Sequence, residues 1–279
     1  MKPQDFQLMS SLVRERSGLV LGEDKAYLLE SRLMPLTRKL GMKDLDELIG
    51  AIRAKRDEAL IKDVVEAMTT NESLFFRDTK PFEQLKNLVF PQLMKSRAAT
   101  KRIRIWSAAC SSGQEPYSIA MILRETESLF AGWRVEIVAT DLSEEVLEKA
   151  KSGAYTQFEV QRGLPITLLV KYFKQEGDKW RLDPAIRSMV EFKPFNLLEN
   201  PATLGQFDII FCRNVLIYFD QKTKGEVLDR MSRIIPADGV LYLGGAETVL
   251  GITDRFAPVS GQRGLYQLVA ASQPARLSA

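Results

Sequence analysis

The segment IRIWSAACSSGQEPYS, residues 103–118, decides the fold of this chain. β-branched and aromatic residues lead from Ile103 into a turn of small residues that ends at Gly113. After the turn, apolar residues recur at the spacing of an α-helix, at Tyr117, Ala120, Met121 and Leu123. The segment therefore predicts a strand, a loop and a helix, in that order.

The next segment, VEIVATDLSEEVLEKAKSG at residues 135–153, repeats this order. A strand from Val135 ends at the acidic Asp141, and the following helix is capped by Ser143 and closed by Gly153. Two such units in succession predict an α/β fold with a parallel sheet and right-handed crossovers. Ligands of these folds bind at the carboxyl ends of the strands, where we expect residues 108–113 to meet Asp141.

The composition of this edge indicates an adenosine pocket. Small side chains let a ligand lie against the backbone, and Asp141 can accept hydrogen bonds from both hydroxyls of a ribose. The glycine spacing that a pyrophosphate requires is absent, and Glu115 at the helix start would repel a phosphate and suit a cation. These features favour S-adenosylmethionine over a dinucleotide, although an ordinary βαβ turn with a helix cap stays open.

The composition sets wider limits. The chain has 279 residues, 45% hydrophobic and 27% charged, which suits one large globular domain or two unequal ones. No apolar run is long enough to span a membrane, and the first residues lack a secretory signal, so we expect a cytoplasmic protein without membrane insertion. In a reducing compartment, Cys110 and Cys212 are expected to be packing residues rather than a disulfide.

The chain contains no histidine. This excludes Ser-His-Asp and Cys-His catalysis and most sites for first-row metals, and we expect no metal cofactor. Any chemistry depends on carboxylate, Arg, Lys, Tyr or Ser side chains, or on a bound cofactor. The net charge of +3 is too small to indicate nucleic-acid binding.

Residues 1–70 have apolar positions at helical spacing and predict a small all-helical N-terminal domain. Its second long helix carries a basic face formed by Lys25, Arg32, Arg38, Lys39 and Lys43, which Arg53, Lys55 and Arg56 extend. A solvated helix face is one interpretation, and a docking face for an acidic helix or a nucleic acid is the other. No aromatic residues interleave with these charges, which disfavours nucleic acid.

Residues 71–90 form the predicted linker between this domain and the large domain at 91–279. The linker begins within the string TTNESLFFRDTK, in which Phe75 and Phe76 are expected to be core anchors. The polar residues Asn71, Ser73 and Arg77 surround these anchors, so the linker is a candidate lid over the ligand pocket.

The C-terminal half is expected to complete the sheet. Strands are predicted at 189–195, at 207–212 and within VLYLGG and GLYQLVA, with a helix at 222–235 and an antiparallel edge at the end. A hairpin with its turn at 176–178 predicts an inserted β-subdomain at about 171–183. Residues 95–104 are expected to be a solvated basic loop, and the tail from Ser272 to be disordered.

The strings MTTNESLFFR, RIWSAACSSGQEPYSIA, ATDLSEEVLEKA, FNLLE and FDIIFCRNVLIYF resemble the CheR-type chemotaxis receptor methyltransferases, in the same order and over almost the whole chain. The resemblance implies a class I S-adenosylmethionine-dependent methyltransferase, with a Rossmann-like sheet, a helical N-terminal domain and an inserted β-subdomain. It implies S-adenosylmethionine as methyl donor and S-adenosylhomocysteine as product. The implied acceptors are glutamate side chains of methyl-accepting chemoreceptors, which would become methyl esters.

The resemblance also implies the site residues. Cofactor contacts would fall on Asn71, Ser73, Arg77, Glu115, Asp141, Asn196, Leu197, Arg213 and Asn214. Arg77 and Tyr218 would lie near the transferred methyl group and act as the catalytic pair. The basic N-terminal residues Arg32, Arg38 and Arg53 would bind the receptor.

Three features differ from the family pattern. Ser73 replaces a frequent Thr but keeps the hydroxyl, and the motif GGAE at 244–247 lacks a frequent histidine, so no role can be transferred to that position. The short hairpin around Gly177 favours receptor recognition without a C-terminal pentapeptide tether, by a monomeric enzyme. A methyltransferase for RNA or a small molecule, and a non-catalytic S-adenosylmethionine sensor, are the alternative functions.

Overall fold

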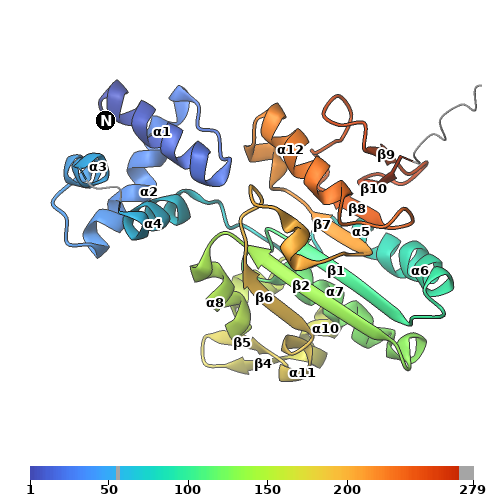
Figure 1. The fold of residues 1–279 in the computed structure, drawn as a ribbon. Helices are drawn as coiled ribbons and strands as arrows, with labels where there is room; N and C mark the ends of the chain where they lie inside the picture. Colours follow the sequence, from blue (N-terminus) through green and yellow to red (C-terminus); the bar gives the residue numbers. More distant parts are fainter. Residues whose placement is uncertain (55–56, 270–279) are drawn as a thin grey trace, which may run out of the picture.

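The computed structural model describes residues 1–54 and 57–269, and its central feature is a mostly parallel sheet (Figure 1). In the described residues this sheet has seven strands in the order β6-β2-β1-β7-β8-β10-β9. The strands are β1 (Arg102–Ala108), β2 (Arg134–Asp141), β6 (Val190–Pro194), β7 (Ile209–Cys212), β8 (Val240–Leu243), β9 (Phe256–Pro258) and β10 (Leu265–Leu268). Strands β6, β2, β1, β7 and β8 are parallel, whereas β10 is antiparallel to both β8 and β9.

The central strands are buried on both faces, as their nearly continuous apolar sequences predict. In β7, Ile209 and Phe211 pack into the core on one face, while Ile210 and Cys212 pack into the core on the other. The helices that border the first core include α5 (Lys80–Gln84), α6 (Phe90–Ser96), α7 (Gln114–Glu125) and α8 (Glu144–Ser152), and α12 (Gln221–Ser232) borders the second. A π-helical segment at Leu85–Val89 joins α5 to α6.

Both predicted strand-and-helix units are confirmed. The Ser143 side chain accepts a hydrogen bond from the Val146 N–H at the start of α8, and Gly153 ends that helix in the left-handed conformation with φ 60°. Cys110 and Cys212 are buried and unbridged, and burial raises the pKa of both thiols well above the usual value. They are packing residues, as expected.

The first part of the chain is helical. It comprises α1 (Pro3–Ser17), α2 (Ala26–Lys39), α3 (Leu45–Ala54) and α4 (Glu58–Met68), with a 3₁₀ turn at Glu23–Lys25. Leu29 and Leu33 of α2 pack with Leu48 of α3 and Val64 of α4 in a core of their own. These helices lie beside the sheet, and residues 69–79 cross from them to α5 (Figure 1). The predicted residues Lys55 and Arg56 lie outside the described residues, as does the tail from Ser272.

The predicted hairpin is present as β4 (Phe173–Glu176) and β5 (Lys179–Leu182). A third strand, β3 (Ala154–Thr156), pairs with β5 and was not predicted, because three residues are too few to show an alternating pattern. The short helices α9 (Gln157–Gln161), α10 (Ile166–Tyr172) and α11 (Pro184–Arg187) surround this small sheet. The subdomain therefore begins earlier in the sequence than the hairpin does.

Two expectations for this domain are confirmed only in part. Residues 97–101 form a mostly exposed turn, but α6 extends to Ser96, β1 begins at Arg102, and Arg97 forms ion pairs with Asp208 and Asp238. Arg104 lies within β1 and is largely buried. The predicted antiparallel edge is present, but the last predicted strand is not its outermost strand, since β9, formed by part of the expected connection, pairs outside it.

Candidate active site

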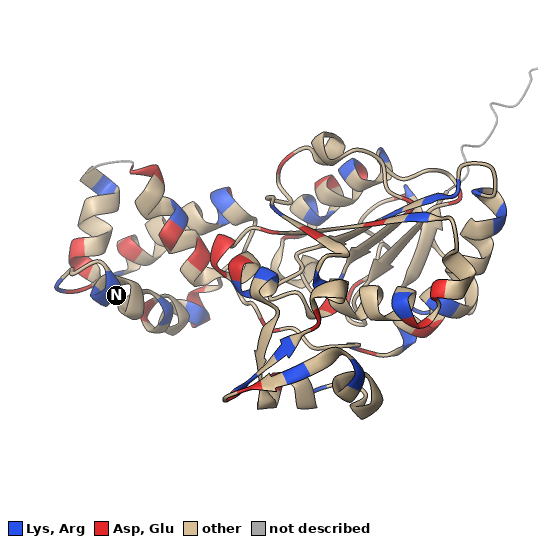
Figure 2. Ribbon diagram, turned by 90° about the horizontal axis from the view of Figure 1, so that it is seen from below, with Lys and Arg blue, Asp and Glu red and all other residues tan. Residues whose placement is uncertain are grey.

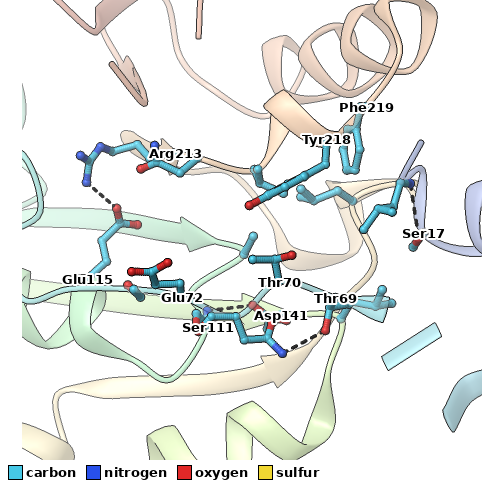
Figure 3. Close-up of a pocket in the computed structure, with 18 of the residues that line it drawn as sticks. Ser17, Thr69, Thr70, Glu72, Ser111, Glu115, Asp141, Arg213, Tyr218 and Phe219 are labelled. Carbon is cyan, nitrogen blue, oxygen red and sulfur yellow. Dashed lines mark hydrogen bonds and ion pairs between the residues drawn. The ribbon is translucent and has the colours of Figure 1, made fainter. Parts of the chain in front are cut away.

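A cavity that opens to solvent lies at the carboxyl ends of the parallel strands (Figure 3). Its walls come from the end of α1, the linker, and the loops after β1, β2, β6 and β7. The residues predicted from the resemblance to touch the cofactor or the methyl group all line it: Asn71, Ser73, Arg77, Glu115, Asp141, Asn196, Leu197, Arg213, Asn214 and Tyr218. The topology therefore brings together residues that are up to 147 positions apart in the sequence.

Asp141 ends β2 and is only 6% exposed. Its Oδ2 accepts the Ser111 N–H at 2.8 Å, and its Oδ1 accepts the Ser143 N–H at 3.1 Å. Burial raises the pKa of this carboxyl above its usual value, although the two N–H groups favour the ionised form. The carboxylate is thus fixed in direction, and each oxygen retains acceptor capacity for a ligand hydroxyl.

The loop after β1 is strained where it approaches Asp141. Ala109 and Ser111 have φ values of 56° and 51°, in the left-handed region that residues with side chains rarely adopt. Gly113 has φ 91°, and a Cβ atom there would lie 2.9 Å from the Ala150 Cβ. Backbone strain of this kind persists where the surrounding structure fixes it, which is typical of ligand sites.

Glu115 is not a free anion at the start of α7. Its Oε1 accepts the Ser107 hydroxyl at 2.8 Å, and its Oε2 pairs with Arg213 Nη1 at 2.9 Å. The Arg213 guanidinium is itself buried and also binds the Arg77 carbonyl and the Asp78 carboxylate. Arg213 therefore connects the end of β7 to the linker, which its position in the sequence does not reveal.

The linker is held against the cavity from several directions. Ser111 Oγ donates to the Asn71 carbonyl at 2.7 Å, and Arg32 donates to the carbonyls of Met68 and Thr69. Within the described residues the Arg77 guanidinium has no carboxylate partner, and its one hydrogen bond is to the Glu72 carbonyl, at 3.4 Å. Its charge thus remains available to an anion that enters the cavity.

The loops after β6 and β7 contribute Asn196 and Tyr218. The Asn196 Nδ2 donates to the Arg16 carbonyl at 2.7 Å, and its Oδ1 accepts the Leu198 N–H at 3.0 Å. The Tyr218 ring lies across the cavity in Figure 3, and its backbone carbonyl accepts the Val20 N–H. Tyr218 is therefore anchored by its backbone and not by its hydroxyl, for which no partner is found among the described residues.

The N-terminal helices complete the wall, which sequence reasoning missed. Ser17 and Leu19 line the cavity, and Leu19 forms a β-bridge with Phe219. Phe195 and Leu142 add apolar surface. No local signal marks Ser17 or Leu19, because they reach the cavity only through the packing of one domain on the other.

The predicted receptor-binding residues do not lie in the cavity lining. Arg32 holds the linker, Arg53 pairs with Asp5 at 2.6 Å, and Arg38 is exposed. Acidic residues are also present on these helices (Figure 2). Of the three arginines, only Arg38 is without a side-chain partner among the described residues.

The strand order and the site chemistry fit S-adenosylmethionine. The donors are three carboxylates, Glu72, Glu115 and Asp141, beside a backbone loop without bulky side chains and apolar surface. The cavity's two cations among the described residues are Arg77 and Arg213, and Arg213 is already paired with Glu115, so the site does not suit a pyrophosphate. In the described part of the chain, no group of three His, Cys, Asp or Glu residues is placed to hold a metal, and no helix could cross a membrane. Fold and site define a class I S-adenosylmethionine-dependent methyltransferase.

Comparison with known proteins gives the family. Residues 4–69 match the CheR methyltransferase all-alpha domain, and residues 71–265 match the CheR methyltransferase SAM binding domain. The chain belongs to the CheR methyltransferase family. The resemblance in the sequence, the predicted fold class and S-adenosylmethionine-dependent methylation in chemotaxis are therefore confirmed.

Curated relatives are similar over nearly their whole length. Chemotaxis protein methyltransferase Cher2 of Pseudomonas putida is 46% identical over 268 residues, which cover 94% of this chain and 97% of the relative. Chemotaxis protein methyltransferase 1 of Pseudomonas aeruginosa is 46% identical, with coverage of 94% and 96%. The chemotaxis protein methyltransferase of Vibrio parahaemolyticus is 42% identical, with coverage of 95% and 97%.

Proposed function

We propose that this enzyme transfers a methyl group from S-adenosylmethionine to glutamate side chains of chemoreceptors, giving methyl esters and S-adenosylhomocysteine. The observation that carries the proposal is Arg77, which lines the cavity without a carboxylate partner among the described residues. An arginine in that state suits an incoming carboxylate. The names of the curated relatives, all chemotaxis protein methyltransferases, support a receptor as the source of that carboxylate.

The chemistry suits a protein without histidine. When bound, S-adenosylmethionine supplies an electrophilic methyl group on a sulfonium. A glutamate carboxylate is already ionised at neutral pH, so the enzyme needs no general base. Its residues have to orient the carboxylate and exclude water, and orientation of this kind can contribute roughly 7–11 kcal/mol. Arg77 is proposed to hold the carboxylate and Tyr218 to orient it with a hydrogen bond.

The proposed cofactor contacts follow from the donors at the cavity. Asp141 would accept the ribose hydroxyls, and Glu115 would lie near the methionine end. Asn71, Ser73, Asn196, Leu197, Arg213 and Asn214 complete the proposed set. Because Asn196 and Arg213 are engaged by other side chains and carbonyls, they would act mainly by shaping the wall. No metal takes part in the proposed reaction.

The proposed partner is the cytoplasmic part of a chemoreceptor, recognised by a monomeric enzyme in the cytoplasm without a pentapeptide tether. The turn of the β4–β5 hairpin is short, with Gly177 at its tip, which leaves little surface to grip a tether. Residues 1–70 would dock the receptor through Arg38. Within the linker at 71–90, the part before α5, residues 71–79, would act as a lid between this domain and residues 91–279, because α5 and the segment after it pack in the core.

A labelling experiment tests the proposed function. Purified enzyme is incubated with S-adenosyl-[methyl-³H]methionine and cytoplasmic fragments of chemoreceptors, and the product is treated with base. We expect label on the receptor that base releases as methanol. Base-stable label, or label on RNA or a small molecule, would contradict the assignment, and cofactor binding without transfer to any receptor fragment would indicate a sensor.

A further inference from the structure

The segment GGAE at 244–247, which follows β8, contains a carboxylate that the proposed chemistry does not use. Glu247 does not line the cavity, and its side chain is partly buried. Its Oε2 accepts the N–H groups of Gly244 at 2.6 Å and Asn214 at 2.8 Å. Its Oε1 accepts those of Val215 at 2.9 Å and Ile217 at 3.3 Å. One side chain thus satisfies four backbone donors.

Three of these donors belong to the loop that follows β7. The parallel ladder ends at Cys212, so the backbone beyond it has no strand partner. Asn214 has φ 60°, in the left-handed region, which Asn tolerates better than most residues with a side chain. A carboxylate that accepts the N–H groups of Asn214, Val215 and Ile217 constrains this conformation, because charged acceptors form the stronger hydrogen bonds.

The same loop contributes Asn214, Val215 and Tyr218 to the cavity. Its backbone position therefore sets where the Tyr218 hydroxyl lies. Gly244 makes the close approach possible, since a Cβ atom there would lie 2.7 Å from Asn214 Nδ2 and 2.8 Å from Glu247 Oε2. Nothing in the local sequence explains why Gly stands at 244 and Glu at 247. The contacts of both residues with the loop after β7 explain both choices.

We infer that Glu247 is a positioning residue for methyl transfer: its carboxylate fixes the loop 213–218 and so places Tyr218 and Asn214 at the cavity. The inference about the loop rests on geometry alone, and its effect on receptor methylation rests on the proposed function. A glutamine at 247 would keep one acceptor oxygen but turn an NH₂ group toward N–H donors. It would lose part of the constraint at nearly constant volume.

The test compares E247Q with G244A and with the control E226Q. Glu226 lies on α12, where it pairs with Arg230, and is not part of the cavity wall. Amide hydrogen exchange of residues 213–219 measures the loop directly. Calorimetry with S-adenosylhomocysteine measures ligand binding, and single-turnover methylation of receptor fragments measures the chemical step.

In E247Q and G244A we expect exchange in 213–219 to accelerate by at least about tenfold, while β1 and β2 stay protected. The single-turnover rate should fall about 10- to 100-fold, with the KM for receptor changed far less. E226Q should match the wild type in all three measurements. Loss of stability without a change in rate would indicate a purely structural role and overturn the inference, as would wild-type exchange in E247Q.

If the wild type itself fails to methylate receptor fragments, the proposed function fails. The exchange measurement, together with S-adenosylhomocysteine binding, then still decides the inference: a loop that stays protected in both variants overturns it, and a loosened loop supports it.

Discussion

The Asp141 carboxylate is buried at the end of β2, where its oxygens already accept two backbone N–H groups. These bonds aim the remaining acceptor capacity at the cavity. Burial disfavours the ionised form, which is why the pKa is raised. A site that needs this anion to bind a ribose is therefore sensitive to acid.

We predict that D141A weakens S-adenosylmethionine binding by roughly 10- to 100-fold or more, since a hydrogen bond to a charged group contributes about 1.5–3 kcal/mol. Calorimetry measures the affinity. In the wild type, affinity should fall as the pH is lowered through the raised pKa, because the protonated carboxyl loses acceptor capacity. An unchanged affinity in D141A would remove Asp141 from the ribose site.

Arg77 offers a second test on a single residue. Among the described residues, the one hydrogen bond of its side chain is to the Glu72 carbonyl at 3.4 Å, so R77A should change the free energy of unfolding by no more than about 0.5 kcal/mol. The single-turnover rate should fall about 100-fold if Arg77 orients the acceptor. R77K keeps the charge but loses the planar fork, so its single-turnover rate should lie between those of the wild type and R77A. Wild-type turnover in R77A would exclude this role.

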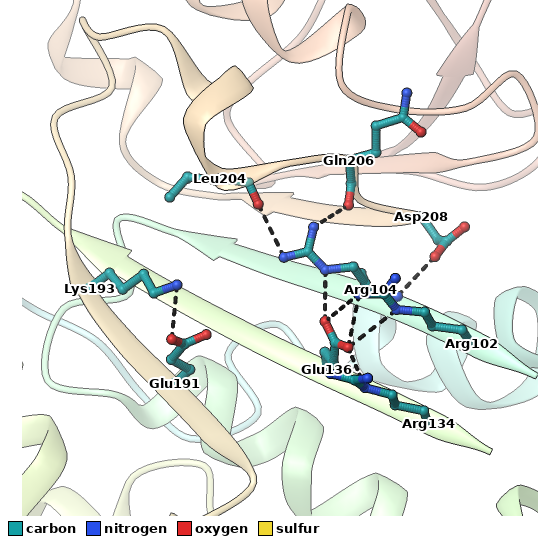
Figure 4. Close-up of polar contacts among 9 residues, drawn as sticks. All are labelled: Arg102, Arg104, Arg134, Glu136, Glu191, Lys193, Leu204, Gln206 and Asp208. Carbon is teal, nitrogen blue, oxygen red and sulfur yellow. Dashed lines mark hydrogen bonds and ion pairs between the residues drawn. The ribbon is translucent and has the colours of Figure 1, made fainter. Parts of the chain in front are cut away.

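Among the elements, the parallel strands β1 and β2 bring three arginines close together, and one carboxylate pairs with all of them. The register places Arg102 beside Arg134, and Arg104 beside Glu136. Glu136 accepts hydrogen bonds or ion pairs from all three arginines (Figure 4). Burial opposes ionisation of Glu136, but the bonds from Arg102 and Arg104 outweigh it and hold the pKa of this carboxyl below its usual value.

We predict that E136Q lowers the free energy of unfolding by about 1–3 kcal/mol, because it leaves Arg104 partly unpaired and the arginines unscreened. Urea denaturation at pH 7 measures the change. E191Q is the matched control, since within residues 1–54 and 57–269 Glu191 pairs only with the half-exposed Lys193, and it should change stability by no more than about 0.5 kcal/mol.

The same pair of variants gives a pH dependence. The folded-state pKa of Glu136 is lowered, so its stabilising contribution is present above the ordinary value of 4.5 and is lost as the pH falls through the lowered pKa. The stability difference between wild type and E136Q should therefore shrink below about pH 4.5. A difference that stays constant down to pH 3 would contradict this account.

For the whole molecule, the active site is a joint product of both domains. The N-terminal domain contributes Ser17, at the end of α1, and Leu19, just after it, to the cavity, and Arg14 pairs with Asp220 at 2.6 Å across the contact. The Glu66 carboxylate accepts the Ser143 hydroxyl and the Glu144 N–H at the start of α8. A substitution on the N-terminal domain can thus alter either receptor docking or the shape of the cavity. Which of the two it alters depends on whether the substituted residue contacts the cavity wall.

We predict that R38E raises the KM for receptor roughly 2- to 5-fold and weakens its salt dependence, while S-adenosylmethionine affinity stays unchanged. R32E should instead weaken S-adenosylmethionine binding as well, because Arg32 holds the linker carbonyls. Kinetics at several ionic strengths, with calorimetry, measure both effects. A salt-insensitive KM that is the same in R38E and wild type would exclude docking through Arg38.

The sequence by itself determined the main elements and the ligand edge, but not the short strands β3 and β9. Alternating and helical apolar spacings, the Ser143 cap and the Gly153 stop depend on neighbours a few residues away, so they could be predicted locally. The position of Asp141 at the end of a buried strand followed from the same patterns. Glu115 at the start of a helix and the linker as a candidate lid also followed from local sequence. For the site residues after β6 and β7, which are Asn196, Leu197, Arg213, Asn214 and Tyr218, the prediction rested on resemblance to a family.

The tertiary structure decided which side chains meet and what each one does. Glu115 pairs with a residue 98 positions away, Glu247 accepts the N–H of a residue 33 positions earlier, and Leu19 reaches the cavity from another domain. Such contacts depend on how elements pack and which way side chains point, and periodicity contains neither. This is why Arg213, predicted as a cofactor contact, also fastens the linker to the sheet.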